Sequence, residues 1–569
     1  MALPEGVTVM KWISELWKRG RSAMAKAGAE MGLSREFRDV FEVGGVPAYR
    51  QFYDEGIFLW KALYRGSYAP WHLVPAPTIA NPKAMRQLYR LNAAKAVSAE
   101  LAGLVWGEQC DIRVSATGTS GATGTSGAAG ATGAGGAGVE GGAAGEGDPL
   151  DRFVRHVLRE NGFYEKMQQS IEQGLALGGA AMKVWYEGEG KATSSDLAAL
   201  GHLPLKGKAL GEGRIRIGYC AADQFVPTAW DNSRVKEAVF VSREARNGRY
   251  YTRLEWHRCD GGVYSVDNEA YRSDARPGAG IGQDILGVRY PLEEAFPELD
   301  AHTEVRVGDS LFTYWRTPIA NNLDDDSPLG VSIYANALET LRALDICYDS
   351  FVQEFELGKK RIIVPARCVR TVADPSTGEM RRYFDPSDRV YEALATDDAG
   401  ELRIQDNSVE LRVEEHVAAL NAFLSILCLQ LGFSANTFSF DGHNGLKTAT
   451  EVVSENSKTY KTIRTVQNQL SPALEHLAHN IIDVAILYGV QWEGRSVESL
   501  AAGGYQVKVV FDDGVTQDRQ TSIAEGVKLV EAGLLSRYRF LTDAKYGQGL
   551  TAGEAEEELR RLKEEKGEG

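Results

Sequence analysis

The stretch that decides the fold is "SPLGVSIYANALETLRALDICYDSFVQEFELGKKRIIVP", residues 327–365. Apolar residues recur in it every three or four positions, which predicts an amphipathic helix from about Val331 to Leu357, roughly 40 Å long. Pro328 and Gly330 stand just before this helix. The apolar stripe consists of Tyr334, Leu338, Leu341, Leu344, Tyr348, Phe351 and Phe355.

The opposite face of this predicted helix is acidic. It holds a single basic residue, Arg342, so we expect it to present negative charge. The carboxylates on this face are Glu339, Asp345, Asp349, Glu354 and Glu356.

A second amphipathic helix is predicted over "VEEHVAALNAFLSILCLQLGFS", residues 413–434, and ends at Gly432. The segment 359–412 between the two helices shows short strand and turn patterns. Because two helices bracket one compact segment, we expect an antiparallel pair with a small α/β unit at its tip. Basic residues of that unit include Lys359, Lys360, Arg361, Arg381 and Arg382.

A glycine-bearing stretch, "FDGHNGLKTATEV" at 440–452, precedes a long helical pattern that continues almost to Gly489. Pro472 interrupts that pattern. It either bends one helix or lies in the first turn of a second helix capped by Ser471, and both alternatives change the chain direction. After one strand-like run, "YQVKVVFDD" at 505–513, the remaining chain is predicted to be helical.

The region before residue 330 combines helices and strands. Helical periodicity covers 81–107 and returns at 153–179, whereas 181–317 contains short β-branched and aromatic runs typical of antiparallel strands. The segment 115–147 is rich in Gly, Ala and Thr and has no aromatic residue, so we expect a flexible insertion in a loop of one continuous domain. The fold class is therefore α+β.

Composition narrows the functional classes. The chain has 569 residues and a formal net charge of −15, which argues against ordinary DNA binding because counterion displacement needs a basic surface. No apolar run approaches the roughly 18 residues that span a bilayer, and the N-terminus lacks the order of a secretory signal. The six cysteines show neither C-x-x-C pairs nor nearby histidines, so we expect no zinc site and no disulfide framework.

An ATPase site is the main catalytic alternative. A phosphate loop needs four residues between its glycines and a lysine directly after the second. Here Gly442 and Gly445 enclose only two residues, and Leu446 separates Gly445 from Lys447. Asp512 and Asp513 are more simply explained as a turn after a strand than as a magnesium site. The motif therefore does not support nucleotide hydrolysis.

Two possible metal sites are weak as well. His476 and His479 lie three residues apart on the long helix, but no further ligand completes a set by spacing. The run Asp324 to Asp326 could bind a divalent cation, yet an acidic run before a proline is more often solvated. The sequence predicts no enzyme, no cofactor and no resident metal.

The order of these parts resembles portal proteins of tailed bacteriophages, in particular the group similar to the portals of Listeria and Bacillus siphophages. The resemblance extends over nearly the whole chain and is most specific at 325–365 and 430–490, including "NGLKTATEVVSENSKTYKTI" (444–463). It implies a ring, usually of twelve copies, at one capsid vertex in the virion, assembled in the host cytoplasm. Double-stranded DNA would pass through this ring without sequence-specific binding. The resemblance implies no membrane partner.

The resemblance also implies names for the parts of the chain. Partners would be the terminase large subunit, a head-completion adaptor, and the major capsid and scaffolding proteins. The segment 359–412, called the clip, would bind the terminase during packaging and the adaptor afterwards. The channel loop would place Gly442, His443, Asn444, Gly445 and Lys447 beside DNA, and the acidic stem face would keep DNA from adhering. The parts are the wing (1–330), first stem helix (331–358), clip (359–412), second stem helix (413–433), channel loop (434–447), long bent helix (448–489), wing strand region (490–514) and crown with tail (515–569).

Two rival classes remain at this stage. A packaging ATPase or nuclease predicts ATP turnover that Lys447→Ala abolishes. A scaffold that never forms a ring predicts elongated oligomers of low order.

Overall fold

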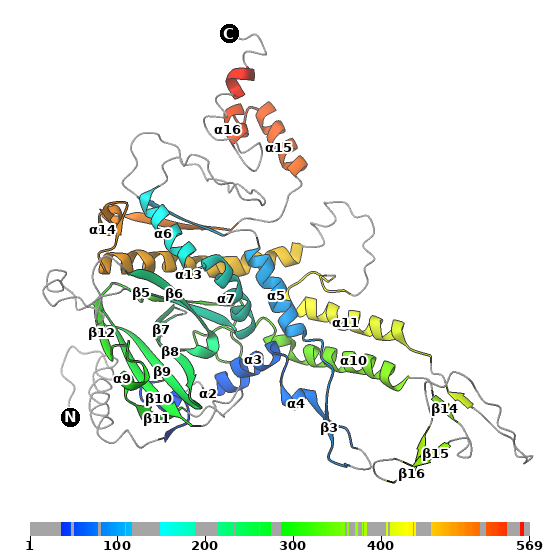
Figure 1. The fold of residues 1–569 in the computed structure, drawn as a ribbon. Coiled ribbons are helices and arrows are strands. Elements are labelled where there is room, and N and C mark those ends of the chain that lie inside the picture. Colours follow the sequence, from blue (N-terminus) through cyan, green and yellow to red (C-terminus); the bar gives the residue numbers. More distant parts are fainter. Residues whose placement is uncertain are drawn as a thin grey trace, which may run out of the picture.

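A computed structural model gives the fold of this chain (Figure 1). All structural statements below refer to the residues that it describes. These are 36–46, 50–77, 81–107, 110–116, 148–187, 213–232, 234–260, 262–274, 286–358, 361–363, 370–373, 378, 380–383, 405–407, 410–435, 437–439, 457–511, 519–542 and 558–562.

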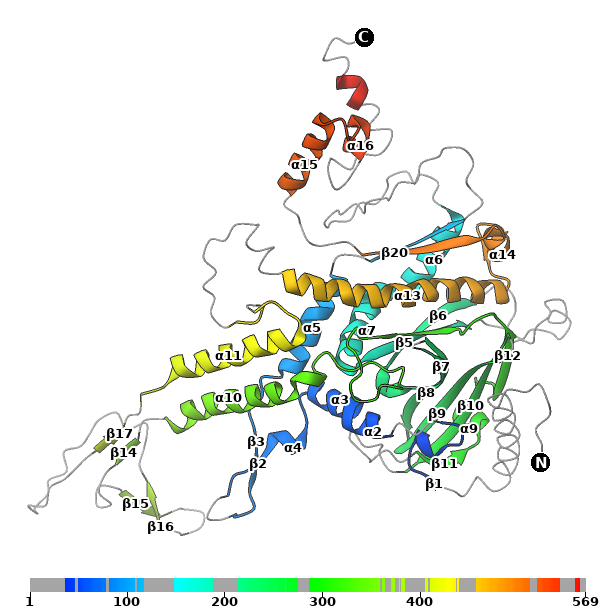
Figure 2. The same cartoon turned by 180° about the vertical axis from the view of Figure 1, so that it is seen from behind.

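Two helices project together from a mixed body of sheets and helices (Figures 1 and 2). They are α10 (Leu338–Leu357) and α11 (Val413–Leu431), and short strands lie beyond their far ends. These strands form two antiparallel pairs: β14 (Arg361–Ile363) with β17 (Gln405–Asn407), and β15 (Arg370–Ala373) with β16 (Met380–Tyr383). The α+β class is thus confirmed at the level of a mixed helical and sheet chain.

The periodicity predicted a helix from about Val331, but the chain is not yet helical there. Only a short 3-10 turn, η6 (Ala335–Ala337), precedes Leu338. The reason is that Val331 and Ile333 use their backbone groups elsewhere: Thr317 Oγ1 donates to the Val331 carbonyl, and the Ile333 N–H donates to the Leu175 carbonyl. These bonds compete with the bonds that a helix would need, and they fix the start of the projecting pair to the body.

Residues 327–334 are buried in the body although they form neither helix nor strand. Leu329, Val331 and Tyr334 are fully buried, and the Tyr334 hydroxyl donates to the Trp60 carbonyl at 2.9 Å. The apolar residues that the sequence assigned to the first turn of a helix therefore serve as an anchor in the core.

The antiparallel strands predicted over 181–317 are confirmed. A three-stranded sheet has the order β13 (Phe312–Arg316), β5 (Gly179–Glu187), β6 (Arg214–Ala221). A seven-stranded sheet has the order β1-β11-β10-β9-β8-β7, and β12 also pairs with β10. Its strands are β1 (Glu36–Phe37), β7 (Phe225–Asp231), β8 (Arg234–Arg246), β9 (Arg249–Asp260), β10 (Val263–Ser273), β11 (Gly287–Tyr290) and β12 (His302–Arg306).

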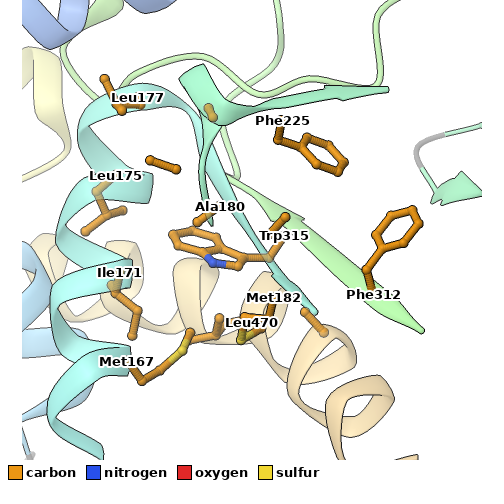
Figure 3. Packing of buried hydrophobic residues seen from close by; sticks show 14 of the residues in the cluster. Met167, Ile171, Leu175, Leu177, Ala180, Met182, Phe225, Phe312, Trp315 and Leu470 are labelled. Carbon is orange, nitrogen blue, oxygen red and sulfur yellow. The ribbon is translucent and has the colours of Figure 1, made fainter. Parts of the chain in front are cut away.

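Trp315 on β13 occupies the centre of the main core (Figure 3). Only 2% of its surface is exposed. Side chains from α7 (Phe163–Leu177), from β5 and from α13 (Ser457–Leu487) surround it, which joins the small sheet to two helices. The labelled neighbours are Met167, Ile171, Leu175, Ala180, Met182 and Leu470.

The helix predicted over 81–107 is wrong in its first half. Helix α5 spans Ala93–Trp106, whereas β2 (Leu73–Pro75) and β3 (Met85–Gln87) form an antiparallel hairpin. Asn92 has a left-handed backbone (φ 54°), which separates α5 from the segment before it.

The flanks of the predicted insertion at 115–147 pack together. The Val114 N–H of β4 (Asp111–Ala116) donates to Asp151 of α6 (Pro149–Glu160), and Arg155 pairs with Asp111 at 2.7 Å. Residues 117–147 lie outside the described residues. The strand predicted near 505–513 is present as β20 (Tyr505–Val510) and pairs with β4.

Helix α13 runs without a break from Ser457 to Leu487, with Pro472 inside it (Figure 2). The alternative in which Ser471 caps a separate helix is wrong, because α13 is one continuous helix on both sides of Ser471 and Pro472. Residues 448–456, where the helical pattern was predicted to begin, lie outside the described part of the chain.

The remaining elements are short. They are η2 (Val40–Glu42), α2 (Arg50–Phe52), the π-helical η3 (Tyr53–Ile57), α3 (Phe58–Tyr64), α4 (Ala69–His72), η5 (Ala222–Gln224), α9 (Leu292–Ala295), β18 (Gln491–Trp492), β19 (Arg495–Ser496), α14 (Val497–Ala501), α15 (Arg519–Glu531) and α16 (Arg537–Thr542).

Candidate functional site

The projecting helix pair is fastened near its far end by one ion pair. Arg412, just before α11, donates two hydrogen bonds to Glu354 of α10 at 3.1 and 2.7 Å. The rings of Phe351 and His416 pack beside this pair with centroids 5.3 Å apart. The hydrogen bonds from Arg412 hold the pKa of Glu354 at about 2, so this carboxylate stays ionised and paired under ordinary conditions.

A second ion pair fastens the β2–β3 hairpin to α10. Arg86 of β3 donates two hydrogen bonds of 2.6 Å to the carboxylate of Asp349. The backbone N–H of Tyr89 donates to the same carboxylate at 3.0 Å. The Asp349 side chain is 7% exposed. Its burial favours the neutral acid, but the bonds from Arg86 and Tyr89 outweigh that effect and lower the pKa of Asp349 below its usual value.

Asp345 and Glu356 extend this attachment along the same face of α10. Asp345 accepts from the backbone N–H of Leu91 at 3.0 Å and lies 3.1 Å from Nε2 of the buried His72. Glu356 accepts from the Tyr89 hydroxyl at 2.7 Å. Three carboxylates on one side of α10, Asp345, Asp349 and Glu356, therefore bind the chain segment that follows β3.

Four of the five carboxylates on the acidic face of α10 thus have partners within the chain, and their exposure to a channel stays a prediction. Asp349 and Glu354 are neutralised by arginines, and Asp345 and Glu356 accept hydrogen bonds within the chain. Glu339 remains solvent exposed. The face serves first as an internal docking surface.

The predicted channel loop has a fixed base. Gly432 ends α11 with a left-handed backbone (φ 81°), and Thr462 of α13 donates to its carbonyl at 2.7 Å. The N–H of Ser434 donates to Thr459 Oγ1 at 2.9 Å. The end of α11 and the first turns of α13 are therefore joined on both sides of the loop.

The loop residues themselves, Gly442, His443, Asn444, Gly445 and Lys447, lie outside the described residues. The same holds for Lys359 and Lys360 of the predicted clip and for Asp512 and Asp513. Arg361, Arg381 and Arg382 are placed on strands β14 and β16 at the far end of the helix pair, and only their backbone is described.

The two histidines considered for a metal site have different partners. His476 lies 3.5 Å from Asp309, whereas the His479 ring bonds to the Tyr505 hydroxyl at 3.0 Å. Asp324 accepts from the backbone of Asp326 in a local turn. Across the described ranges, no cluster of three or more His, Cys, Asp or Glu side chains is arranged to hold a metal ion.

The chain is a portal protein of the tailed-bacteriophage type, since a portal family model matches almost its whole length. The matching family is described as phage portal protein, SPP1 Gp6-like, and its match covers residues 56–569. The chain belongs to this family. A comparison with curated proteins found no match.

Membership in this family establishes a structural role. Portal proteins are components of the virion capsid, they assemble with copies of themselves, and they act with the capsid and its packaging machinery. Among the described helices, none combines the length and the apolar composition needed to cross a membrane.

Sequence reasoning missed the β2–β3 hairpin and its attachment to α10. The partners Arg86 and Asp349 are 263 residues apart, so no local pattern links them. One signal was present: Pro75, Pro77 and Pro82 lie within or beside the hairpin, and prolines at this spacing disfavour a helix.

Proposed function

We propose that twelve copies of this chain form a closed ring at one capsid vertex. Double-stranded DNA passes through the ring during packaging and ejection. The observation that carries the proposal is the pair α10 and α11, which projects from the body with a distal strand unit at its end (Figure 1). Family membership supports the self-assembly on which the ring depends.

In this proposal the helix pair is the stem and 359–412 is the clip. The clip binds the terminase large subunit during packaging and the head-completion adaptor afterwards, while the wing and crown contact the major capsid and scaffolding proteins. The basic residues Lys359, Lys360, Arg361, Arg381 and Arg382 supply positive charge for an acidic partner surface. Replacing them changes partner binding more than ring formation.

The channel loop, 434–447, lies beside the moving duplex. Bonds to Thr462 and Thr459 anchor Gly432 and Ser434 at the base of this loop. Lys447 makes a weak phosphate contact, to which His443 and Asn444 add. Lys461, exposed on the first turns of α13, adds positive charge beside the loop base.

The acidic stem contributes less electrostatic repulsion than its sequence implies. Of the five carboxylates proposed to face the channel, Glu339 and Glu356 are exposed, while Asp349 and Glu354 are paired with arginines. Overall repulsion of DNA therefore depends mainly on the net charge of −15 summed over a ring of copies.

Lys447→Ala distinguishes the portal function from a packaging ATPase. We expect the isolated native protein to show no ATP turnover, and we expect phage particles carrying Lys447→Ala to hold less DNA than native particles, measured as genome content per capsid. The matched control is Lys508→Ala, which removes an exposed lysine on β20 and should leave genome content unchanged. ATP turnover by the native protein that disappears in Lys447→Ala would instead support the ATPase.

A scaffold protein that never forms a ring is the other candidate. It predicts elongated oligomers of low order in solution, which sedimentation velocity separates from a compact ring by their higher frictional ratio.

A further inference from the structure

The β2–β3 hairpin has an unusual distribution of side chains. Paired residues in an antiparallel ladder share a face, and faces alternate along each strand. Val74 and Arg86 therefore share the face that is pinned to Asp349 of α10. The other face carries Leu73, Pro75, Met85 and Gln87, all of them exposed.

The exposed face is more apolar than the pinned one. Leu73 is 46% exposed and Met85 is 54% exposed, while the charged Arg86 points to the interior side. A half-buried sheet normally places its apolar residues inward and its polar residues outward. The reversed arrangement indicates that a further surface covers the outer face in the assembled state.

Helix α11 presents a matching surface on the other side of the stem. Its inner face packs through Leu420, Leu424 and Leu427, which are buried. Its outward stripe, spaced by three and four residues, consists of Glu415, Ala418, Ala422, Ile426 and Leu429, all exposed.

This outward stripe is suited to close packing. Ile426 is 45% exposed and Leu429 is 69% exposed, and the two alanines beside them carry only small side chains. Charge adds to the match, because Lys83 lies exposed beside the apolar hairpin face, and Glu414 and Glu415 lie exposed at the start of α11.

One chain cannot bring these two surfaces together. At about 100° per residue, Asp345 and Asp349, which hold the hairpin side, lie on the opposite side of α10 from Phe351 and Glu354, which contact α11. The hairpin and α11 thus flank α10 on opposite sides. Two different complementary surfaces on opposite sides form a head-to-tail contact, which generates a closed ring when the rotation closes.

We infer that the apolar hairpin face of one copy packs on the outward stripe of α11 of the next copy. This inference rests on the proposed ring and assigns to it one specific contact. The occupant of each surface is a second copy of this chain, and each copy uses its hairpin once and its α11 stripe once.

Disulfide cross-linking tests the contact in the full chain. The double variant Met85→Cys with Ala422→Cys is expected to give, under oxidation, a ladder of covalent multimers on a non-reducing gel. The native chain carries six cysteines and sets the background. Each single variant is expected to match that background, because a hairpin meets α11 and never another hairpin.

Three outcomes of this experiment are decisive. If the double variant forms rings but gives no ladder of covalent multimers, the inference is overturned and the portal function stays intact. Cross-linked dimers of Met85→Cys alone also overturn it, because the hairpins would then meet each other. Absence of any oligomer of the native chain overturns both the inference and the proposed function.

Charge substitution gives an independent test in solution. Met85→Asp and Ile426→Asp are each expected to lower the ring fraction by about tenfold or more, because each buries a carboxylate in an apolar contact. Mixed one to one, the two variants are expected to form complexes of two copies. The intact hairpin of Ile426→Asp can pack on the intact α11 of Met85→Asp, whereas the other contact in such a pair carries both substitutions. Leu323→Asp, which replaces a leucine 57% exposed in a turn of the body, is the matched control and should retain rings.

Each of these residues is exposed, so unchanged thermal melting confirms that the variants fold. Full rings in both aspartate variants, or a mixture that stays monomeric, would contradict the head-to-tail contact.

Discussion

Replacing Gly330 by alanine is expected to destabilise the protein by about 4 kcal/mol or more, because no space exists for a side chain at this position. A Cβ atom on Gly330 would lie 2.1 Å from the Gly178 carbonyl oxygen and 2.9 Å from Cβ of Arg316. The nearest neighbour is backbone, which cannot rotate away. Gly178 faces the same restriction, because its own Cβ would lie 2.2 Å from the Gly330 carbonyl oxygen.

The consequence extends beyond stability. Residues 327–334 anchor the start of α10 in the core, so a displaced Gly330 backbone moves the helix pair relative to the body. Chemical denaturation of native and variant chains measures the effect. Gly308→Ala is the matched control, because a Cβ there meets nothing within 4 Å. Equal stabilities of the two variants would show that the close approach of Gly178 and Gly330 is not required.

Asp349→Ala is expected to release the β2–β3 hairpin from α10, with a loss of about 2–3 kcal/mol in local stability. The substitution leaves the Tyr89 N–H without its acceptor and Arg86 without its partner. Because the Arg86 side chain is 34% exposed, it can turn to solvent, which keeps the loss below that of a fully buried pair. Hydrogen exchange of residues 85–91 reports the release.

Glu339→Ala is the control for this prediction, since Glu339 is an exposed carboxylate on the same helix. It should leave exchange at 85–91 unchanged. If Asp349→Ala also leaves those amides protected, the ion pair does not hold the hairpin.

The attachment also has a defined pH dependence. The pKa of Asp349 is lowered in the folded chain, so its contribution is fully present above the unfolded value of about 3.9. This contribution to the attachment is lost as the pH falls through the lower pKa that Asp349 has in the folded chain. Exchange protection of 85–91, corrected for intrinsic rates, should therefore be constant from pH 7 to pH 5 and decline only in strong acid.

Local patterns in the sequence predicted those parts of the fold whose determinants are local. Alternating β-branched and aromatic residues over 181–317 predicted antiparallel strands, and the structure confirms them. The apolar stripes of α10 and α11 predicted both helices, and Gly432 marked the end of the second.

The errors arise where distant residues compete for backbone or side-chain groups. The start of α10 was placed seven residues too early because Thr317 and Leu175 bind the backbone of 331–333. No local pattern reveals the partners of Asp349 and Asp345 on α10, because Arg86 and His72 lie more than 250 residues away in sequence. The roles assigned to the residues of the channel loop and of the clip stay predictions.

Electron microscopy of the purified full-length chain tests the central claim most directly. The account predicts closed rings with an open axial hole, and it predicts that the rods α10 and α11 extend from the body of every copy around that hole. Particles that stay monomeric at every concentration, or that grow into open filaments, would contradict it.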